Sequence, residues 1–321
     1  MRCLYCYREL PGSAIDFHTT CSRKIFGIPK APNLPYSEEQ MLTLAKEVVK
    51  SQTAVTGVQA KLSLNIERPT KKKELKPDEH PNVRFTIVGL WGGYILKPPT
   101  EHFKFLPEVE DLTMHLARIA GIETVPHSLI RLASGNLAYI TKRIDRIGAT
   151  KLHMEDMCQL TERLTEDKYK GSYEQIAKCI LRYSCNPGLD VLNFYEQVVF
   201  SFLTGNADMH LKNFSLIKNS NLGYVLSPAY DMVASALLMK NDNEDLALTL
   251  NGKKRKLTRK DFDKLLLISP LTSPKSVERL YNKFIKSVPT WRTFIESSFL
   301  PTELKNEYRK IINDRAKRLD F

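Results

Sequence analysis

The chain has 321 residues, of which 42% are hydrophobic and 26% charged, which is normal for a globular protein that buries a core. Its 48 Lys and Arg against 36 Asp and Glu leave a net charge of +12, which suits nucleic acid, nucleotide or an acidic partner, although each basic run taken singly is more simply a solvated face. No apolar run has membrane-span length, no signal-peptide core begins the chain, and six cysteines are too few for a disulfide scaffold, so we expect a cytoplasmic protein without membrane contact.

Residues 1–35 contain a group of potential metal ligands followed by a proline-rich linker. Cys3 and Cys6 are spaced as one pair of soft ligands and His18 and Cys21 as another, which is the pattern of a small structural zinc site. The segment is too short to own a hydrophobic core, so a bound Zn²⁺ would explain how it folds. The alternative is that these cysteines are simply buried apolar residues.

Residues 36–141 predict a small, β-rich N-lobe that binds a nucleotide. Ser37 caps a helix, with Gln40 as its capping-box partner. A loop of small residues follows, whose backbone N–H groups could lie on phosphates; an ordinary turn is the alternative. Short apolar runs then predict about five strands with one inserted helix: strands over 62–66, 83–88, 94–97, 125–132 and 137–141, and the helix over 107–119.

Lys97 ends the apolar strand over 94–97, as the lysine of the kinase Val-Ala-Ile-Lys motif does. A lysine there can act as a point charge for nucleotide phosphates, whereas a strand-end lysine taken alone can equally reach solvent. Glu108 and Glu110 lie in the first turn of the next helix, where they favour the helix dipole. In a kinase, a helix at this point would bring a carboxylate to the strand lysine.

Residues 142–321 predict a larger, helical C-lobe. Ser172 begins one helix through a capping box, and a long apolar helix follows Asn186-Pro187 and ends at Gly205. We expect one further strand over 246–250 and helices from there onward.

The stretch after Gly205 has the most specific chemical pattern in the chain. It lies between the long helix and a predicted hairpin of 214–217 with 224–226, which places Asp208 and Asn213 on a polar loop and Asp231 just past the hairpin. A protein-kinase catalytic loop carries an Asp that orients the attacking hydroxyl and then an Asn that holds a metal, and a second Asp completes the magnesium site. Magnesium prefers such oxygen ligands. The alternative is that these are ordinary turn residues.

Together these stretches resemble the HipA-like serine/threonine kinases, the toxin components of bacterial toxin–antitoxin systems. The matching segments run in family order over most of residues 50–260: Thr56-Gly57-Val58-Gln59-Ala60-Lys61, Ile95-Leu96-Lys97-Pro98, Leu152 to Gln159, Gly205 to Ser215 and Pro228 to Ala236. The resemblance implies an α+β, two-lobed, protein-kinase-like fold. It also implies that ATP and Mg²⁺ are the cofactors.

The resemblance implies a role for each matched position. Asp208 would be the catalytic aspartate, Asn213 and Asp231 the Mg²⁺ ligands, and Lys97 the phosphate lysine. The remaining ATP-binding residues would be Gly57, Gln59 and Lys61 in a flexible phosphate loop, His210, Lys212 and Tyr230 along the nucleotide site, and Lys142 and Ile144 beside adenine at the hinge.

The chain departs from ordinary protein kinases and from part of the family. Its catalytic loop lacks the His-Arg-Asp triplet, and Asp231 is followed by Met-Val rather than Phe-Gly, both of which fit the HipA group. Family members often autophosphorylate a serine in the phosphate loop, and Ala54, natural or engineered, stands at the aligned position here. The nearby hydroxyls that could replace it are Ser51, Thr53 and Thr56.

Longer family members carry an extra β-rich N-terminal subdomain that this chain lacks, so it looks like the short, HipT-type toxins. The resemblance implies an aminoacyl-tRNA synthetase as substrate, with inhibition of translation. It implies a HipB-like DNA-binding antitoxin and a small HipS-like protein as partners, with DNA contacted only through the antitoxin.

Two alternative functions are a kinase with a small-molecule acceptor and a catalytically silent kinase-fold module that binds an antitoxin on DNA. The intact set of Asp208, Asn213, Asp231 and Lys97 argues against the silent module.

Overall fold

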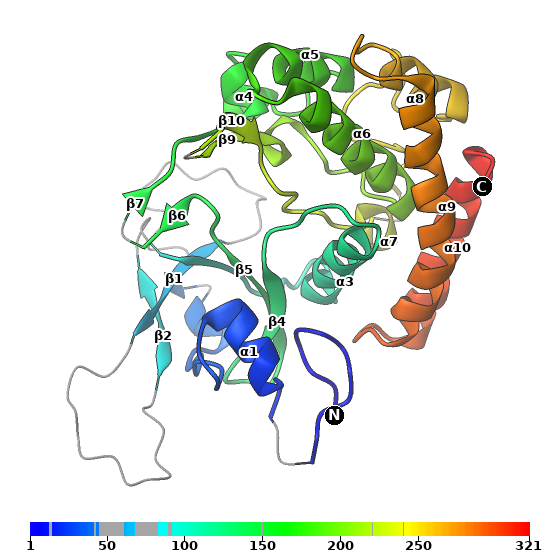
Figure 1. Ribbon diagram of the computed structural model, residues 1–321. Helices are drawn as coiled ribbons and strands as arrows, with labels where there is room; N and C mark the ends of the chain where they lie inside the picture. The colour runs from blue at the N-terminus through cyan, green and yellow to red at the C-terminus, as the bar shows by residue number, and fades with distance from the viewer. Residues whose placement is uncertain are drawn as a thin grey trace, which may run out of the picture. The chain divides into compact units, whose positions relative to one another are not determined.

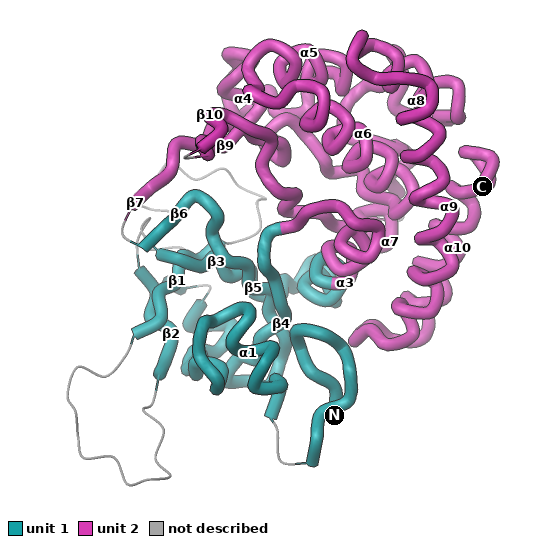
Figure 2. Tube along the Cα trace, viewed as in Figure 1, with its two compact units in different colours: residues 1–111, 125–148 teal, residues 112–124, 149–321 magenta. Residues whose placement is uncertain are grey.

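A computed structural model describes residues 1–12, 15–41, 43–44, 61–67, 83–88, 92–148, 150–219, 221–239 and 241–321. The chain forms two compact units (Figure 2), one of residues 1–111 with 125–148 and the other of residues 112–124 with 149–321. Helix α3, Leu106–Ile119, contributes residues to both units. None of the helices in the described ranges is both long and apolar enough to cross a bilayer.

The first unit is built on an antiparallel sheet of five strands in the order β2-β1-β3-β5-β4 (Figure 1). Its strands are β1 Leu62–Glu67, β2 Arg84–Val88, β3 Tyr94–Lys97, β4 His127–Arg131 and β5 Leu137–Lys142. All five predicted strands are therefore confirmed, with α3 inserted between β3 and β4. Their alternating apolar residues, such as Leu62, Leu64 and Leu96, are buried because one face of the pleat is covered.

The N-terminal segment packs on this sheet and shares its core. Helix α1, Thr19–Phe26, ends at Gly27, whose positive φ of 74° is the left-handed cap that favours glycine. The Phe26 ring meets the Phe85 ring edge to face, with centroids 5.6 Å apart, and the Tyr94 hydroxyl donates to the Ile25 carbonyl at 3.1 Å. The buried side chains of this segment therefore pack against the sheet, which agrees with the expectation that the segment is too short to form a hydrophobic core alone.

The second unit is mainly helical and also contains a small sheet. Strands β8 Met154–Asp156, β9 Ser215–Asn219 and β10 Gly223–Leu226 form this sheet in the order β10-β9-β8, which confirms the predicted hairpin. The two-residue strand β7, Thr150–Lys151, precedes this sheet in the chain, and the two-residue strand β6, Arg146–Ile147, lies at the end of the first unit. The helical elements are α4 Met157–Leu160, η1 Thr165–Asp167, α5 Tyr173–Tyr183, α6 Pro187–Thr204, η2 Leu211–Asn213, α7 Ser235–Leu238, α8 Arg259–Leu266, α9 Pro274–Glu296 and α10 Thr302–Arg318.

The predicted helix boundaries hold where capping chemistry is local. Ser37 and Gln40 bond reciprocally, and so do Ser172 and Gln175 at the start of α5. Helix α6 begins after Asn186 with Pro187 in its first turn. Its second half is buried on every side, so it is the central helix of this unit, packed against α5 and α10.

The strand predicted over residues 246–250 is wrong. This segment forms bends, and only Thr249 and Leu250 make isolated bridges, to Ser172 and Lys253. Its apolar side chains are nevertheless all buried. A short apolar run indicates burial, but periodicity alone does not distinguish a strand from a buried irregular segment.

Candidate active site

The catalytic-loop candidate begins at Gly205, where α6 ends. Gly205 has a φ of 73°, and its N–H caps the helix on the carbonyls of Phe202 and Ser201. A Cβ atom at this position would lie 3.0 Å from Ile311 Cγ2 and 3.1 Å from Ala236 Cβ. Only glycine meets both the backbone and the packing requirement.

Replacing Gly205 by Ala should destabilise the fold more than the same change at Gly252. Both glycines have a φ of 73°, so each substitution costs roughly 1–2 kcal/mol of backbone strain. Gly252 has no atom within 4 Å of the new methyl group, whereas crowding at Gly205 adds roughly 1–3 kcal/mol. Urea unfolding of the two variants measures the difference; equal free energies of unfolding would contradict the crowding argument.

The loop backbone is held by the segment that follows Asp231. The Ala207 N–H donates to Ser235 Oγ at 2.8 Å, and the Ala236 N–H donates to the Gly205 carbonyl at 3.0 Å. The buried Asn206 accepts the Asp208 N–H on its side-chain oxygen at 3.1 Å. These bonds restrain the loop at the point where Asp208 leaves it.

Asp208 and Asn213 are joined directly. The Asn213 side-chain nitrogen donates to the Asp208 carbonyl at 2.9 Å. Because only the NH₂ end of the amide can donate to a carbonyl, the Asn213 Oδ1 atom is left as an acceptor.

The Tyr169 hydroxyl donates to Asp208 Oδ1 at 2.6 Å. Burial of the phenol raises the pKa of Tyr169, and the neighbouring Asp208 carboxylate raises this pKa further. Nothing in the sequence pattern indicated Tyr169, which lies 39 residues before its partner.

Asp231 lies past the end of β10 in an uncommon backbone conformation. Its φ is 55°, a region that Asp tolerates better than most residues and that recurs at functional sites. The backbone is bonded on both sides of it within the same unit. The Ala229 N–H donates to the Glu123 carbonyl at 2.8 Å, and the Ala234 N–H donates to Thr113 Oγ1 at 3.2 Å.

The charges of Asp208 and Asp231 both act on the His210 imidazole. Burial lowers the pKa of His210 to about 4, and the charges of Asp208 and Asp231 offset part of that shift. The imidazole is therefore neutral at physiological pH, and its ring meets the Tyr169 ring edge to face at 4.9 Å. Both carboxylates thus act on a neutral imidazole, and Asn213 is hydrogen-bonded to the Asp208 backbone.

Lys212 and Tyr230 contact the sheet of this unit. The Lys212 ammonium pairs with Asp156 of β8 at 2.7 Å. The Tyr230 hydroxyl donates to the Lys212 carbonyl at 3.0 Å and is hydrogen-bonded to Ser215, and burial raises the pKa of this phenol. Both side chains thus brace the catalytic loop. Asp156 belongs to a stretch that carries the family resemblance, although no role was predicted for it.

In the first unit, Lys97 forms a buried ion pair with Glu110 of α3. Lys97 is 4% exposed and Glu110 is 2% exposed. The Lys97 ammonium also lies 5.4 Å from the centroid of the Tyr139 ring, on the neighbouring strand β5. Lys97 is therefore not a strand-end lysine that reaches solvent, which was the alternative interpretation of the sequence. The carboxylate that the helix brings to it is Glu110 rather than Glu108.

Glu108 lies half-buried two positions after the first residue of α3, where burial and then the Asp111 charge raise its pKa to about 7. Because this carboxyl group has a higher pKa in the folded than in the unfolded chain, the free energy of unfolding of the protein falls as pH rises from about 4.5 to 7. Glu108→Gln should therefore match the wild type near pH 4 and exceed it at pH 8, by up to about 3 kcal/mol. Urea unfolding at both pH values measures this. Parallel pH dependences for the two proteins would contradict it.

The remaining nucleotide candidates are only partly described. Lys61 is exposed beside β1, Lys142 is exposed at the end of β5, and Ile144 is half-buried. The Lys142 N–H donates to the Pro126 carbonyl at 2.9 Å, so this donor is already used. The other phosphate-loop candidates lie outside the described residues: Gly57 and Gln59, with Ser51, Thr53, Ala54 and Thr56.

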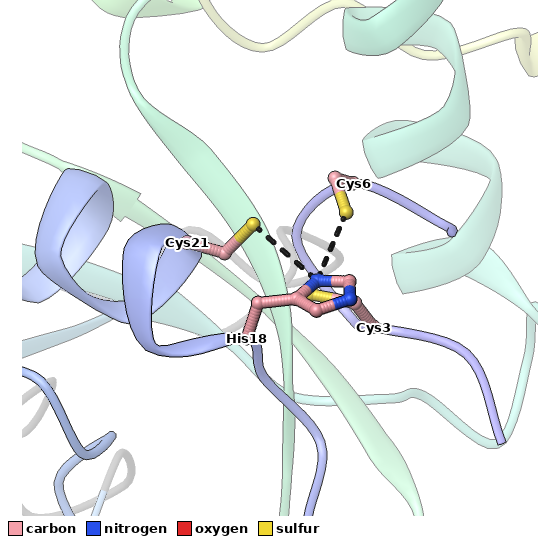
Figure 3. A group of neighbouring side chains, drawn as sticks. All are labelled: Cys3, Cys6, His18 and Cys21. Atoms are coloured by element: carbon pink, nitrogen blue, oxygen red, sulfur yellow. Dashed lines mark hydrogen bonds between the residues drawn. The ribbon is translucent and has the colours of Figure 1, made fainter. Parts of the chain in front are cut away.

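The four N-terminal ligand candidates come together. The ligand atoms of Cys3, Cys6, His18 and Cys21 all lie within 4.8 Å of one another (Figure 3). The sequence placed them in two pairs, and the structure brings both pairs to one point.

The chain has relatives of known sequence. It is 32% identical over 237 residues to a candidate kinase of Haemophilus influenzae, covering 69% of this chain and 63% of that protein. It is 33% identical over 270 residues to the candidate kinase Y4dM of Sinorhizobium fredii, covering 80% of this chain and 60% of that protein. The matches therefore span less than two thirds of the length of these relatives.

Two solved structures share the fold. HipA of Shewanella oneidensis, in a complex with HipB and operator DNA, superimposes with a TM-score of 0.64 at 18% identity, covering 97% of this chain and 74% of HipA. The proinflammatory kinase CtkA of Helicobacter pylori gives 0.51 at 15% identity, covering 70% of this chain and 84% of CtkA. The predicted α+β, protein-kinase-like fold is confirmed.

The family follows from the extent of the sequence match. Residues 53–292, which contain Lys97, Asp208, Asn213 and Asp231, match the family model of the HipA-like C-terminal domain. The relatives described as candidate kinases and the HipA structure agree with that match. The chain belongs to the HipA-like C-terminal domain family.

Proposed function

We propose that this protein is an ATP- and Mg²⁺-dependent serine/threonine protein kinase that acts as a toxin of a bacterial toxin–antitoxin system. The observation that carries the proposal is the hydrogen bond from the Asn213 side-chain amide to the Asp208 carbonyl, which leaves Asn213 Oδ1 as an acceptor. This geometry leaves an amide oxygen for a hard cation on the same loop as the Asp208 carboxylate, which can receive a proton. The names of the relatives and the family support the same activity.

Each residue has a distinct part in the proposed transfer. Asp208 accepts the proton of the substrate hydroxyl and orients its oxygen toward the phosphoryl group. Asn213 and Asp231 would hold Mg²⁺, which when bound neutralises charge on the phosphates. Lys97, oriented by Glu110, contributes a positive charge to the phosphates of ATP.

The other assigned positions keep supporting roles in this proposal. The Tyr169 hydroxyl orients the Asp208 carboxylate. The Lys212–Asp156 pair and the Tyr230 hydroxyl hold the loop that carries Asn213. Besides Lys97, the nucleotide contacts proposed on the family resemblance are Gly57, Gln59, Lys61, Lys142, Ile144, His210, Lys212 and Tyr230.

The proposed substrate is an aminoacyl-tRNA synthetase, whose phosphorylation would inhibit translation. The proposed partners are a HipB-like antitoxin, through which alone the protein would meet DNA, and a small HipS-like protein, as for the HipT-type toxins. The neighbouring HipA structure, which contains HipB and operator DNA, supports the antitoxin. The net charge of +12 suits acidic partners of this kind.

The test is incubation of the purified protein with labelled ATP, Mg²⁺ and a panel of purified tRNA synthetases. We expect label on a serine or threonine of one synthetase, located by mass spectrometry, and loss of charging activity by that enzyme. Label on small metabolites alone would support the small-molecule kinase instead. Absence of ATP turnover together with salt-dependent DNA binding in the presence of antitoxin would support the silent module.

A further inference from the structure

We propose that Cys3, Cys6, His18 and Cys21 bind one structural zinc ion with three sulfur ligands and one nitrogen ligand. The site lies entirely within the first unit and shares no residue with the set assigned to phosphoryl transfer. Its four side chains come from the turn at residues 3–6, from His18, which caps α1, and from the first turn of α1 (Figure 3). Four protein ligands leave no open position, which is the pattern of a structural rather than a catalytic zinc site.

The distances between ligand atoms suit this ion. His18 Nδ1 lies 3.5 Å from Cys6 Sγ and 3.7 Å from Cys21 Sγ. A tetrahedral ion with zinc–sulfur bonds of about 2.3 Å and zinc–nitrogen bonds of about 2.0–2.1 Å separates sulfur from nitrogen by about 3.6 Å. The two measured separations match that value, so an ion would require little rearrangement of these three side chains.

The second ring nitrogen of His18 supports the same conclusion independently. His18 Nε2 lies 2.9 Å from the Glu9 carbonyl oxygen. A carbonyl can only accept, so Nε2 carries the hydrogen, and in the neutral imidazole Nδ1 then keeps its lone pair. That lone pair is directed at the thiols of Cys6 and Cys21. Histidine ligands of zinc commonly donate their other N–H to a carbonyl in this way, which fixes the tautomer and the ring orientation.

A disulfide explains the cluster less well. Three cysteines cannot all pair with one another, and any one disulfide would leave the third thiol and the His18 lone pair without a role. Cys3 and Cys21 are 0% and 7% exposed, so they are poorly placed to act as reactive thiols.

The proposed ion would secure the segment that covers β4 and the start of α3. Leu4, inside the first ligand pair, accepts the Ser128 hydroxyl of β4 on its carbonyl at 3.2 Å. Tyr7, next to Cys6, donates its hydroxyl to Asp111 of α3 at 2.7 Å, and the other Asp111 oxygen bonds to His127 at 2.6 Å. All these groups are buried, so loss of the ion should loosen the contacts of this unit rather than only its terminus.

The test uses the full chain, purified from cells grown with added zinc. We expect one equivalent of tightly held zinc, lost on Cys6→Ser and on His18→Ala but retained on Cys185→Ser, which replaces an exposed cysteine outside the cluster. We also expect zinc to protect Cys3, Cys6 and Cys21 from alkylation, mapped by mass spectrometry, while Cys185 reacts. A folded wild-type chain without stoichiometric zinc would overturn the proposal, as would a disulfide within the cluster.

A second measurement uses only the wild-type protein, so it remains informative if the Cys6 and His18 variants do not fold. Metal-stripped wild-type protein titrated with Co²⁺ should give the intense visible bands of tetrahedral cobalt and a thiolate charge-transfer band, both displaced by Zn²⁺. Octahedral cobalt spectra or unchanged spectra would overturn the proposal. Neither measurement depends on kinase activity, so the zinc site and the proposed function can fail separately.

Discussion

Asp208→Asn should reduce phosphoryl transfer by about 10²–10⁴-fold, because the amide cannot accept the proton of the substrate hydroxyl. The fold should survive the change. The Asp208 backbone N–H and carbonyl still bond to Asn206 and Asn213, and an amide oxygen can still accept the Tyr169 hydroxyl. Initial rates with labelled ATP at saturating substrate measure the loss, and growth arrest on expression should disappear with it.

Two control variants make this prediction specific. Asp314→Asn removes a half-exposed carboxylate of α10 in the same unit and should leave the rate unchanged. Tyr169→Phe removes only the hydroxyl bonded to Asp208 and should lower the rate by less than Asp208→Asn does. If Asp208→Asn kept wild-type transfer or wild-type toxicity, the catalytic assignment would be wrong.

Breaking the buried pair of Lys97 and Glu110 should lower both stability and activity. Lys97→Met leaves the Glu110 charge buried beside an apolar chain, and Glu110→Met does the same to Lys97. Removing one partner of a buried pair typically costs about 3–5 kcal/mol. Urea unfolding measures that loss, and the KM for ATP should rise in both variants.

The double variant separates the structural from the chemical role. Lys97→Met with Glu110→Met replaces both charges by apolar chains of similar length, so most of the stability should return. Transfer activity should stay lost, because the charge assigned to the phosphates is gone. Arg84→Met, which breaks the exposed pair with Glu67, is the matched control and should leave stability nearly unchanged. A double variant with wild-type activity would remove Lys97 from the mechanism.

The local elements of this protein could be predicted because their signals are local. The capping boxes at Ser37 and Ser172 and the glycine stop at Gly205 each depend on a few neighbouring residues and their backbone angles. The order of Lys97, Asp208, Asn213 and Asp231 along the chain was likewise enough to indicate the family, which the match over residues 53–292 confirms.

Packing decided the points on which the sequence was silent or misleading. The apolar run over 246–250 was predicted as a strand, but among the described residues it pairs only through isolated bridges at Thr249 and Leu250, and its buried residues form bends instead. Glu110, rather than Glu108, meets Lys97 because the two glutamates point to different sides of one helical turn.

Thus the sequence by itself determined the five strands of the first unit, the hairpin and the capped helix starts, and it supplied the candidates for phosphoryl transfer and for zinc. Only the tertiary structure decided their partners: Glu110 for Lys97, Tyr169 for Asp208, and the Glu9 carbonyl for His18. The reason is that backbone preferences act over a few residues, whereas a buried charge or lone pair takes its partner from whatever segment the packed core brings beside it.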